Sequence, residues 1–326
     1  MIRFAVVGTN WISHAFCEAA QESGRLELVA VYSRTLETAQ TFADEYGVSR
    51  VYDDLDEIAG QPDIDAVYIA SPNSLHAPQA SLFIRQGKHV IVEKPMASNL
   101  AETEALIALA KEHGVVLLEA MKSRYTPNLV RAKEVLATLG PLHRASLSYC
   151  QYSSRYQRYL DGKNPNTFNP EFSNGSLMDI GVYPLSAALE LFGIPKSFTA
   201  SGQLLDSGVD AHGSLTLKYD TFEVLLSHSK VSDSYLPSEI QCENGSLMIE
   251  SISRFKQLTV HERGLPERNV SLHQSDNEMV YEAHHFADLI EQGNYDHEGL
   301  EKTREVSRIL TEARAQLGIT YPADAL

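Results

Sequence analysis

A lysine at the end of an apolar run is the first residue in this chain that could do chemistry. In the stretch Lys-His-Val-Ile-Val-Glu-Lys-Pro, residues 88–95, the part from His89 to Val92 has the pattern of a short buried strand. Pro95 lacks an N–H and biases Lys94 towards an extended conformation, so we expect the strand to end here. Ligands of open α/β sheets bind at the carboxyl ends of strands, which makes Lys94 a candidate acid/base. A sharp turn at this point also raises the hypothesis of a cis bond between Lys94 and Pro95.

A glycine turn after the first predicted strand points to a dinucleotide site. Residues 8–13 read Gly-Thr-Asn-Trp-Ile-Ser, whereas the full fingerprint is Gly-x-Gly-x-x-Gly. Only the first glycine is present, but Asn10 tolerates unusual backbone angles and Ser13 is small enough for close packing. An ordinary strand-to-helix turn, with Trp11 in the core, is the alternative. The predicted cofactor contacts are Gly8, Thr9, Asn10, Trp11 and Ile12.

The residues after the second predicted strand indicate which dinucleotide binds. NAD enzymes place a carboxylate about 20 residues beyond the glycine turn, where it binds the ribose 2'-hydroxyl. This chain has Ser33 and Arg34 at that place. A guanidinium matches phosphate oxygens in a bidentate fork, so we predict NADP as the cofactor, with NAD possible. The alternative is that Arg34 is a solvated loop residue.

Regular alternation of strands and helices must position these groups. Six alternations before residue 122 predict a doubly wound parallel sheet of the Rossmann type, in an α/β fold. We assign residues 1–122 to this dinucleotide-binding domain and expect the last helix, about 298–317, to pack back on it. The expected strands are 2–7, 26–32, 51–52, 65–70, 89–92 and 115–120.

Strand-like segments joined by short turns dominate residues 123–297. They predict a substrate-binding α/β domain with a large open antiparallel sheet. The polar, aromatic segment 155–174 is expected to be a loop that faces the substrate. One apolar face of the sheet must be buried, which predicts a homodimer or a dimer of dimers. The expected strands are 144–152, 196–205, 213–219, 222–231, 238–242, 246–250 and 257–261.

Three motifs occur in order along the chain: Ser-Pro-Asn-Ser-Leu-His at 71–76, Glu-Lys-Pro at 93–95 and Gly-Ser-Leu-Met-Asp-Ile-Gly-Val-Tyr at 175–183. They are similar to the T-P-N-x-x-H turn, the E-K-P motif and the G-x-L-x-D-x-G-x-[HY] segment of one family. The chain therefore resembles the Gfo/Idh/MocA oxidoreductases, the family of glucose-fructose oxidoreductase, inositol dehydrogenase and the dimeric dihydrodiol dehydrogenases. The resemblance covers nearly the whole chain. It implies cofactor contacts from Ser71, Pro72, Asn73, His76, Glu93 and Lys94, and a catalytic site at the nicotinamide made of Lys94, Asp179 and Tyr183.

The chemistry of these three residues fits that implication. Oxidation of a carbinol needs a base for the hydroxyl proton, and burial beside a positive nicotinamide is expected to lower the pKa of Lys94. Asp179 and Tyr183 are four residues apart, on one face of a helix. Tyr183 would donate or relay the proton, and Asp179 would orient the substrate or Lys94. A helix cap for Asp179 and a core position for Tyr183 are the alternatives. Tyrosine at 183 resembles glucose-fructose oxidoreductase and the dihydrodiol dehydrogenases, which prefer NADP.

The resulting prediction is an NADP-preferring oxidoreductase. It would move a hydride between the nicotinamide and a secondary alcohol or carbonyl carbon of a sugar, polyol or cyclic diol. A dinucleotide-sensing regulator on the same fold, without turnover, and a binding module without dinucleotide are the alternatives. Weaker candidates for substrate contacts, each of which could equally be structural, are Arg124, Tyr152, Tyr156 and Asn166.

Composition excludes several other classes. The formal net charge of -16 disfavours nucleic acid and anionic membranes as partners. Three separated cysteines indicate neither a disulfide framework nor a metal site. The start of the chain has no leader pattern. We therefore expect a cytoplasmic protein without membrane segments. Neighbouring His284 and His285 diverge by about 100° on a helix, so they cannot chelate together with Glu282, and no metal is expected.

Overall fold

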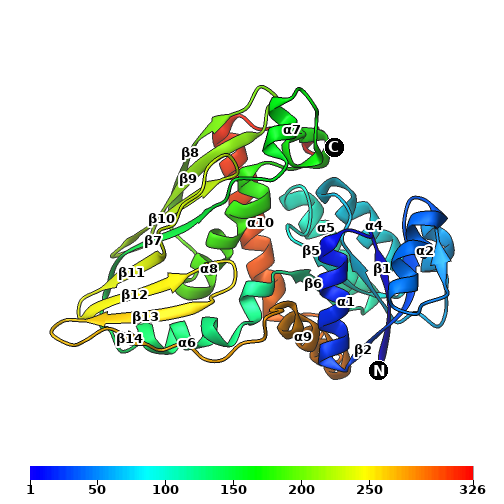
Figure 1. Cartoon of the computed structure of the whole chain (residues 1–326), viewed down its shortest axis with the longest axis horizontal. Coiled ribbons are helices and arrows are strands. Elements are labelled where there is room, and N and C mark those ends of the chain that lie inside the picture. The colour runs from blue at the N-terminus through cyan, green and yellow to red at the C-terminus, as the bar shows by residue number, and fades with distance from the viewer. Residues whose placement is uncertain (326) are drawn as a thin grey trace. The chain divides into compact units, whose positions relative to one another are not determined.

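The computed structural model describes residues 1–325 and divides into two compact units (Figure 1). Unit 1 comprises Met1–Met121 and Ser275–Ser307, and unit 2 comprises Lys122–Gln274 and the chain from Arg308 onward. The sequence-based domain 123–297 differs from this division, because residues 275–297 belong to unit 1. The reason is a set of contacts distant in sequence: in α9 (Met279–Gln292), Asp288 and Glu291 pair with Arg25.

Unit 1 contains the predicted Rossmann sheet. Within the described residues its strand order is β3-β2-β1-β4-β5-β6, and every neighbouring pair is parallel. The order reverses between β1 and β4, so the carboxyl ends of these strands form the ligand-binding edge of such a sheet. The strands are β1 (Ile2–Val7), β2 (Leu26–Tyr32), β3 (Val51–Tyr52), β4 (Ala66–Ile69), β5 (His89–Glu93) and β6 (Leu117–Ala120).

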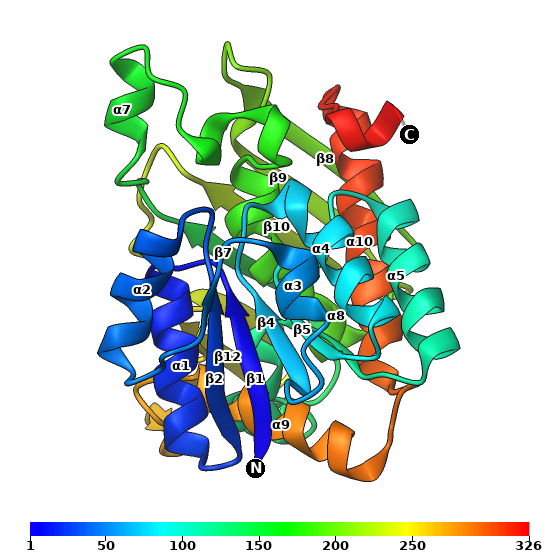
Figure 2. The same cartoon turned by 90° about the vertical axis from the view of Figure 1, so that its right-hand side faces the viewer.

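Helices cover both faces of this sheet (Figure 2). On one face Phe16 of α1 packs edge-on against Phe4, at 5.7 Å between ring centroids, and stacks on Tyr68 at 3.8 Å. On the other face Phe83 of α4 and Leu106 of α5 join the core. Because helices bury the side chains on both faces of the sheet, its strands are continuous apolar runs in the sequence. The helices are α1 (Trp11–Ser23), α2 (Leu36–Glu45), α3 (Leu55–Ala59), α4 (Asn73–Arg85), α5 (Leu100–His113) and the first part of α10 (Glu298–Leu317).

Unit 2 is built on a sheet whose order, among the described residues, is β14-β13-β12-β11-β7-β10-β9-β8. The predicted antiparallel sheet is corrected at one place, because β7 and β10 pair in parallel. Two α-helices, three short helical turns and two strands intervene between them, so the argument from short turns does not apply to this pair. The strands are β7 (Leu142–Cys150), β8 (Ser197–Leu204), β9 (Asp210–Lys218), β10 (Glu223–Ser229), β11 (Ser238–Cys242), β12 (Gly245–Glu250), β13 (Gln257–Glu262) and β14 (Arg268–Asn269).

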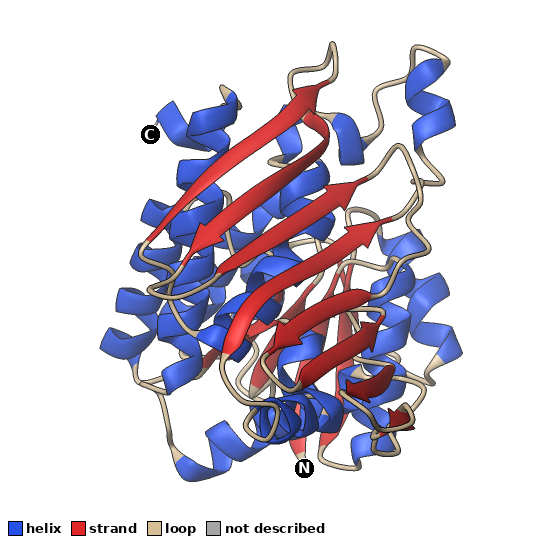
Figure 3. Ribbon diagram, turned by 90° about the vertical axis from the view of Figure 1, so that its left-hand side faces the viewer, coloured by secondary structure: helices blue, strands red, loops and turns tan. Residues whose placement is uncertain are grey.

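One face of the unit 2 sheet carries no helix among residues 1–325, and Figure 3 looks onto this open face. The loop predicted at 155–174 contains only short helical turns. The helical elements of unit 2, besides the second part of α10, are η1 (Lys122–Tyr125), α6 (Pro127–Leu136), α7 (Tyr156–Leu160), η2 (Asn166–Phe168), η3 (Pro170–Phe172), η4 (Leu177–Gly181), α8 (Val182–Phe192) and η5 (Pro322–Ala325).

Candidate active site

The glycine turn between β1 and α1 is shaped for close approach. Gly8 has φ +103°, and a Cβ there would lie 2.8 Å from the carbonyl oxygen of Ala70, so only glycine fits. Asn10 stands where the fingerprint has its second glycine. Its Oδ1 accepts from the N–H of Ile12 at 2.9 Å and caps α1, while its Nδ2 donates to the Ala70 carbonyl at 2.7 Å. Trp11 is 71% exposed, so the alternative that placed it in the core is wrong.

The residues predicted to discriminate between NADP and NAD lie beside this turn. Ser33 is buried at the end of β2, with its Oγ 3.4 Å from the Oγ1 of Thr9. Arg34 follows it with an exposed side chain. The carboxyl ends of β1 and β2 thus offer two hydroxyls and a guanidinium, and no carboxylate follows β2 directly.

A buried histidine joins two of the predicted motifs. The Nε2 of His76 lies 2.8 Å from the carbonyl oxygen of Ser71, and its Nδ1 lies 2.9 Å from that of Pro95. Burial lowers the pKa of His76, and the charge of Lys94 lowers it further, against the two carbonyls. The bond between Lys94 and Pro95 is cis, as hypothesised. His76 therefore links the turn at the end of β4 to the turn that carries Lys94.

Two buried glutamates, Glu93 at the end of β5 and Glu119 in the neighbouring β6, accept hydrogen bonds close to Lys94 in the sheet. Glu93 is buried and accepts a 2.6 Å hydrogen bond from the hydroxyl of Tyr68. Burial, followed by the charge of Glu93, raises the pKa of Tyr68. Glu119 of β6 accepts from the N–H of Met96 at 3.0 Å and from Thr303 at 2.9 Å. Glu119 was missed from the sequence, because nothing local distinguishes it from another strand residue.

The segment predicted to hold Asp179 and Tyr183 is not a simple α-helix. Leu177–Gly181 forms a π-helical turn, η4, which continues into α8. The i→i+5 bonding of a π-turn changes the rotation per residue, so the argument that placed the two residues on one α-helical face does not hold as stated. Such turns are frequent at functional sites. Tyr183 is half-buried, with its ring edge-on to that of Tyr149 in β7 at 5.6 Å.

Asp179 forms an ion pair with Lys230, whose side chain is largely buried. Lys230 directly follows β10, so the signal that singled out Lys94, a lysine at the carboxyl end of a strand, could also have found it. Asp179 is therefore paired, which differs from the helix-cap alternative. Lys94 lies in unit 1, whereas Asp179, Tyr183 and Lys230 lie in unit 2, and their convergence on one site stays a prediction.

Two buried titratable residues support this segment from within unit 2. Asp210 Oδ2 accepts from the N–H of Leu177 at 2.6 Å, and His228 Nδ1 lies 2.8 Å from the Oγ of Ser176. Burial raises the pKa of Asp210 to about 6 and lowers that of His228 to about 3. A Cβ on Gly181 would lie 3.1 Å from the His228 ring, so this glycine permits the close packing. Sequence analysis missed both residues, because each lies in a strand distant from the segment.

The weaker substrate candidates fall into two groups. Arg124 is buried, its Nε donating to Ser186 at 3.0 Å and lying 3.8 Å from the carboxylate of Glu190, and its substrate role stays a prediction. Tyr152 is 42% exposed and packs edge-on against Tyr156 at 5.5 Å between ring centroids. Asn166, at the start of η2, is also exposed.

Residues 1–325 contain no group of three or more His, Cys, Asp or Glu side chains placed to hold a metal ion. Over this range no helix has the length and apolar character to cross a membrane.

Comparison with known proteins decides the family. The model described as "Oxidoreductase family, NAD-binding Rossmann fold" matches residues 2–121, and the "GFO/IDH/MocA C-terminal domain" matches residues 129–248. The chain belongs to the GFO/IDH/MocA oxidoreductase family. The predicted family, fold class and enzyme class are confirmed.

Relatives of this GFO/IDH/MocA protein extend over its full length. Oxidoreductase YgjR of Escherichia coli, described as uncharacterized, is 53% identical and covers 100% of this chain and 99% of its own. IolU of Bacillus subtilis, scyllo-inositol 2-dehydrogenase (NADP(+)), is 47% identical, covering 99% of both. The 3-ketoreductase KijD10 of Actinomadura kijaniata, solved with NADP and TDP-benzene, has a TM-score of 0.85 at 22% identity and covers 97% of both chains, which shows a shared fold.

Proposed function

We propose that the protein is an NADP-preferring dehydrogenase of a polyol, with inositols as the first substrates to test and sugars and cyclic diols next. The observation that carries this proposal is the full-length similarity, at 47% identity, to a protein named scyllo-inositol 2-dehydrogenase (NADP(+)). The NADP preference has independent support, because a buried Ser33 and an exposed Arg34 follow β2 where NAD enzymes have a carboxylate.

The residues of unit 1 fit a dinucleotide. The turn at Gly8 leaves no room for a side chain, and the first turn of α1 contains no acidic residue that would repel a pyrophosphate. Thr9, Asn10 and Ile12 would hold the pyrophosphate, and Ser33 with Arg34 would hold a 2'-phosphate. When bound, the nicotinamide exchanges a hydride with the carbinol or carbonyl carbon of the substrate.

The chain itself handles the proton. Lys94 takes the hydroxyl proton during oxidation and returns it during reduction, with Tyr183 as donor or relay. Asp179, held by Lys230, orients the substrate hydroxyl or Lys94. Tyr149 supports the ring of Tyr183 from β7 and limits the positions that its hydroxyl can take.

A binding and turnover series tests the proposal. NADP and NADPH should raise the melting temperature more than NAD and NADH, and the inositol isomers, sugars and cyclic diols should then be screened for NADP reduction. Lys94→Ala should lose about 100-fold or more in turnover of the best substrate. Arg34→Ala should weaken NADP binding by about tenfold and leave NAD binding within about twofold, unlike the exposed control Arg85→Ala. Wild-type turnover by Lys94→Ala would refute the acid/base role. NADPH binding without turnover of any carbonyl would favour the regulator.

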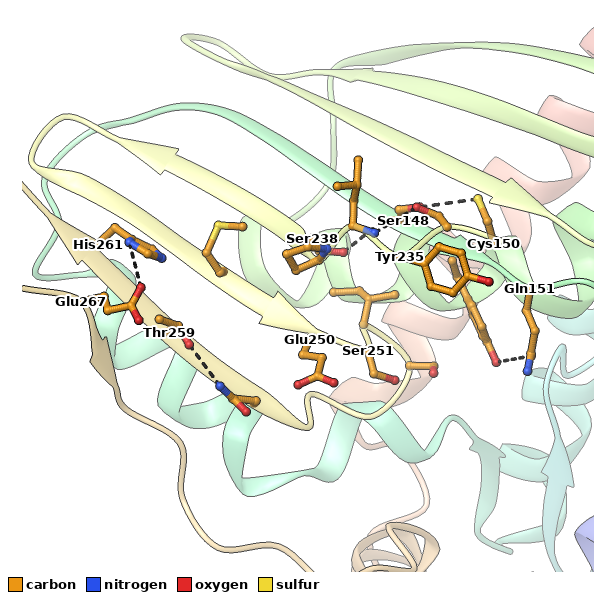
Figure 4. Close-up of a pocket in the computed structure, with 18 residues that line it drawn as sticks. Ser148, Cys150, Gln151, Tyr235, Ser238, Glu250, Ser251, Thr259, His261 and Glu267 are labelled. Atoms are coloured by element: carbon orange, nitrogen blue, oxygen red, sulfur yellow. Dashed lines mark hydrogen bonds and ion pairs between the residues drawn. The ribbon is translucent and has the colours of Figure 1, made fainter. Parts of the chain in front are cut away.

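Self-association through the open sheet face is also part of the proposal. A shallow cavity of about 700 Å³ lies there, lined by residues of β7, β11, β12 and β13, including Ser148 and Thr259 (Figure 4). At its edge Tyr235 is 93% exposed and Leu236 is 80% exposed. We infer that a second copy of the chain covers this face and forms a homodimer. The three free cysteines fit a cytoplasmic location.

A further inference from the structure

The C-terminal turn of the chain contacts the start of the segment that carries Asp179. Tyr321 is 3% exposed, and its hydroxyl donates to the carbonyl oxygen of Asn174 at 2.8 Å. Asn174 directly precedes Gly175, the first residue of the G-x-L-x-D segment. All of these residues belong to unit 2, although 147 positions separate the two hydrogen-bonded residues.

A buried arginine and a partly exposed aspartate hold Tyr321 in place. The guanidinium of Arg314 is buried and lies 4.1 Å from the centroid of the Tyr321 ring. It donates to both carboxylate oxygens of Asp324, at 2.7 and 3.0 Å, and Asp324 also accepts from the N–H of Tyr321 at 2.8 Å. A bidentate arginine–carboxylate pair fixes geometry as well as distance. The phenol that reaches Asn174 is therefore preorganised.

Asp210 holds the same segment at the next residues. Gly175 has φ +145°, and a Cβ there would lie 2.3 Å from Asp210 Oδ1, so the backbone runs directly against this carboxyl group. The other oxygen of Asp210 accepts from the N–H of Leu177. The N–H of Asp179 in turn donates to the carbonyl of Gly175 at 3.1 Å. The backbone of Asp179 is thus set by the position of Asn174 and Gly175.

We propose that Tyr321 is a positioning residue, whose hydrogen bond to Asn174 sets the position of Asp179 for the reaction. This role rests on the proposed function of Asp179. Tyr321 touches neither substrate nor cofactor in this proposal. It acts through Asn174, Gly175 and the first turn of η4, where a small displacement moves the Asp179 carboxylate away from its working position.

Tyr321→Phe tests this role, because it deletes one hydroxyl and keeps the ring under Arg314. The matched control is Tyr219→Phe, since the hydroxyl of Tyr219 also donates to a backbone carbonyl of unit 2, that of Gly193, at 3.0 Å. Hydrogen exchange of amides 174–179 should be faster in Tyr321→Phe and unchanged in Tyr219→Phe. With the best substrate, kcat should fall about tenfold in Tyr321→Phe and stay within about twofold in the control, while the NADPH dissociation constant stays within about twofold in both.

The two readouts separate this proposal from the proposed function. Unchanged exchange at 174–179 in a folded Tyr321→Phe, or an unchanged kcat, overturns the positioning role. If the wild type turns over none of the substrates, the proposed function fails, and exchange alone decides whether Tyr321 positions the segment. If Tyr321→Phe does not fold, Asp324→Asn, which keeps the phenol but weakens its support, is measured in the same way and with the same criteria.

Discussion

Lys230 forms an ion pair with the carboxylate of Asp179 on the π-turn. The lysine side chain has a relative exposure of 9% and the aspartate 30%, so solvent screens their interaction only in part. Under the proposed function, each unit contributes one lysine with its own role: Lys94 of unit 1 would transfer the proton, and Lys230 of unit 2 would hold the carboxylate of Asp179.

Lys230→Met should remove the ammonium group that pairs with Asp179 and lower kcat/KM by about ten- to 100-fold, whereas Lys230→Arg should recover part of that loss. Steady-state kinetics with the best substrate measures both. The dissociation constant of NADPH serves as the control, because the predicted dinucleotide contacts lie in unit 1. Equal losses in the Met and Arg variants would contradict a role that depends on charge.

His228 predicts a pH dependence of stability. Burial lowers its pKa from 6.5 to about 3, so its contribution is fully present above pH 6.5 and is lost as the pH falls towards 3. Between pH 7 and 4.5 the wild type should therefore lose about 2 kcal/mol more of its unfolding free energy than His228→Asn. Urea denaturation at the two pH values measures the difference.

The exposed His273→Asn provides the control for this experiment and should behave as the wild type. The contribution of Asp210 to the unfolding free energy has the opposite pH dependence. Because its pKa is raised to about 6, this contribution is largest at low pH and is lost as the pH rises through 6. Asp210 lies 3.7 Å from His228, so the difference between the two proteins reports His228 together with its interaction with Asp210. Parallel pH profiles for wild type and His228→Asn would refute the assignment.

Among the elements, the turn between β1 and α1 carries the strictest backbone requirement of the dinucleotide-binding edge. Asn10 caps α1 and ties the turn to the end of β4, so one side chain supplies both the helix start and the contact between neighbouring strands. A complete glycine fingerprint is not needed for this geometry, because Gly8 alone meets the close approach to Ala70.

Gly8→Ala should abolish measurable NADPH binding and lower the melting temperature, because its Cβ would meet the Ala70 carbonyl. Gly24→Ala is the matched control: it also has a positive φ, at the end of α1, but no atom lies within 4 Å of its Cβ position. It should cost about 1 to 2 kcal/mol of stability and leave NADPH affinity unchanged. Loss of binding in both variants would show that α1 merely unfolds.

Elements with local signals were predictable from the sequence. The apolar run before Gly8 indicates its strand from adjacent residues alone. The parallel pairing of β7 with β10 depends on partners far apart in the chain. The same holds for Asp210, His228 and Tyr321, which reach the segment 174–181 from strands and from the C-terminus. Local periodicity carries no information about such contacts.

For the whole molecule, the open face of the unit 2 sheet is the feature that predicts association. Leu236→Asp should convert the proposed dimer to a monomer, because it would replace an exposed apolar side chain at the edge of the cavity by a charge that the contact would have to bury. Sedimentation equilibrium measures the mass, and Ile194→Asp, 54% exposed outside this face, is the control. A wild type with the mass of one chain, or a Leu236→Asp variant with an unchanged dimer, would refute this surface.

The division of the chain also has a consequence for biosynthesis. Unit 1 consists of Met1–Met121 and Ser275–Ser307, so its second segment is synthesised only after residues 122–274. Until then α1 lacks Asn277, which bonds the Ala15 carbonyl at 2.7 Å, and β6 lacks Thr303, which bonds Glu119. While residues 122–274 are being synthesised, the first 121 residues therefore lack the contacts that the second segment of unit 1 makes with α1 and β6.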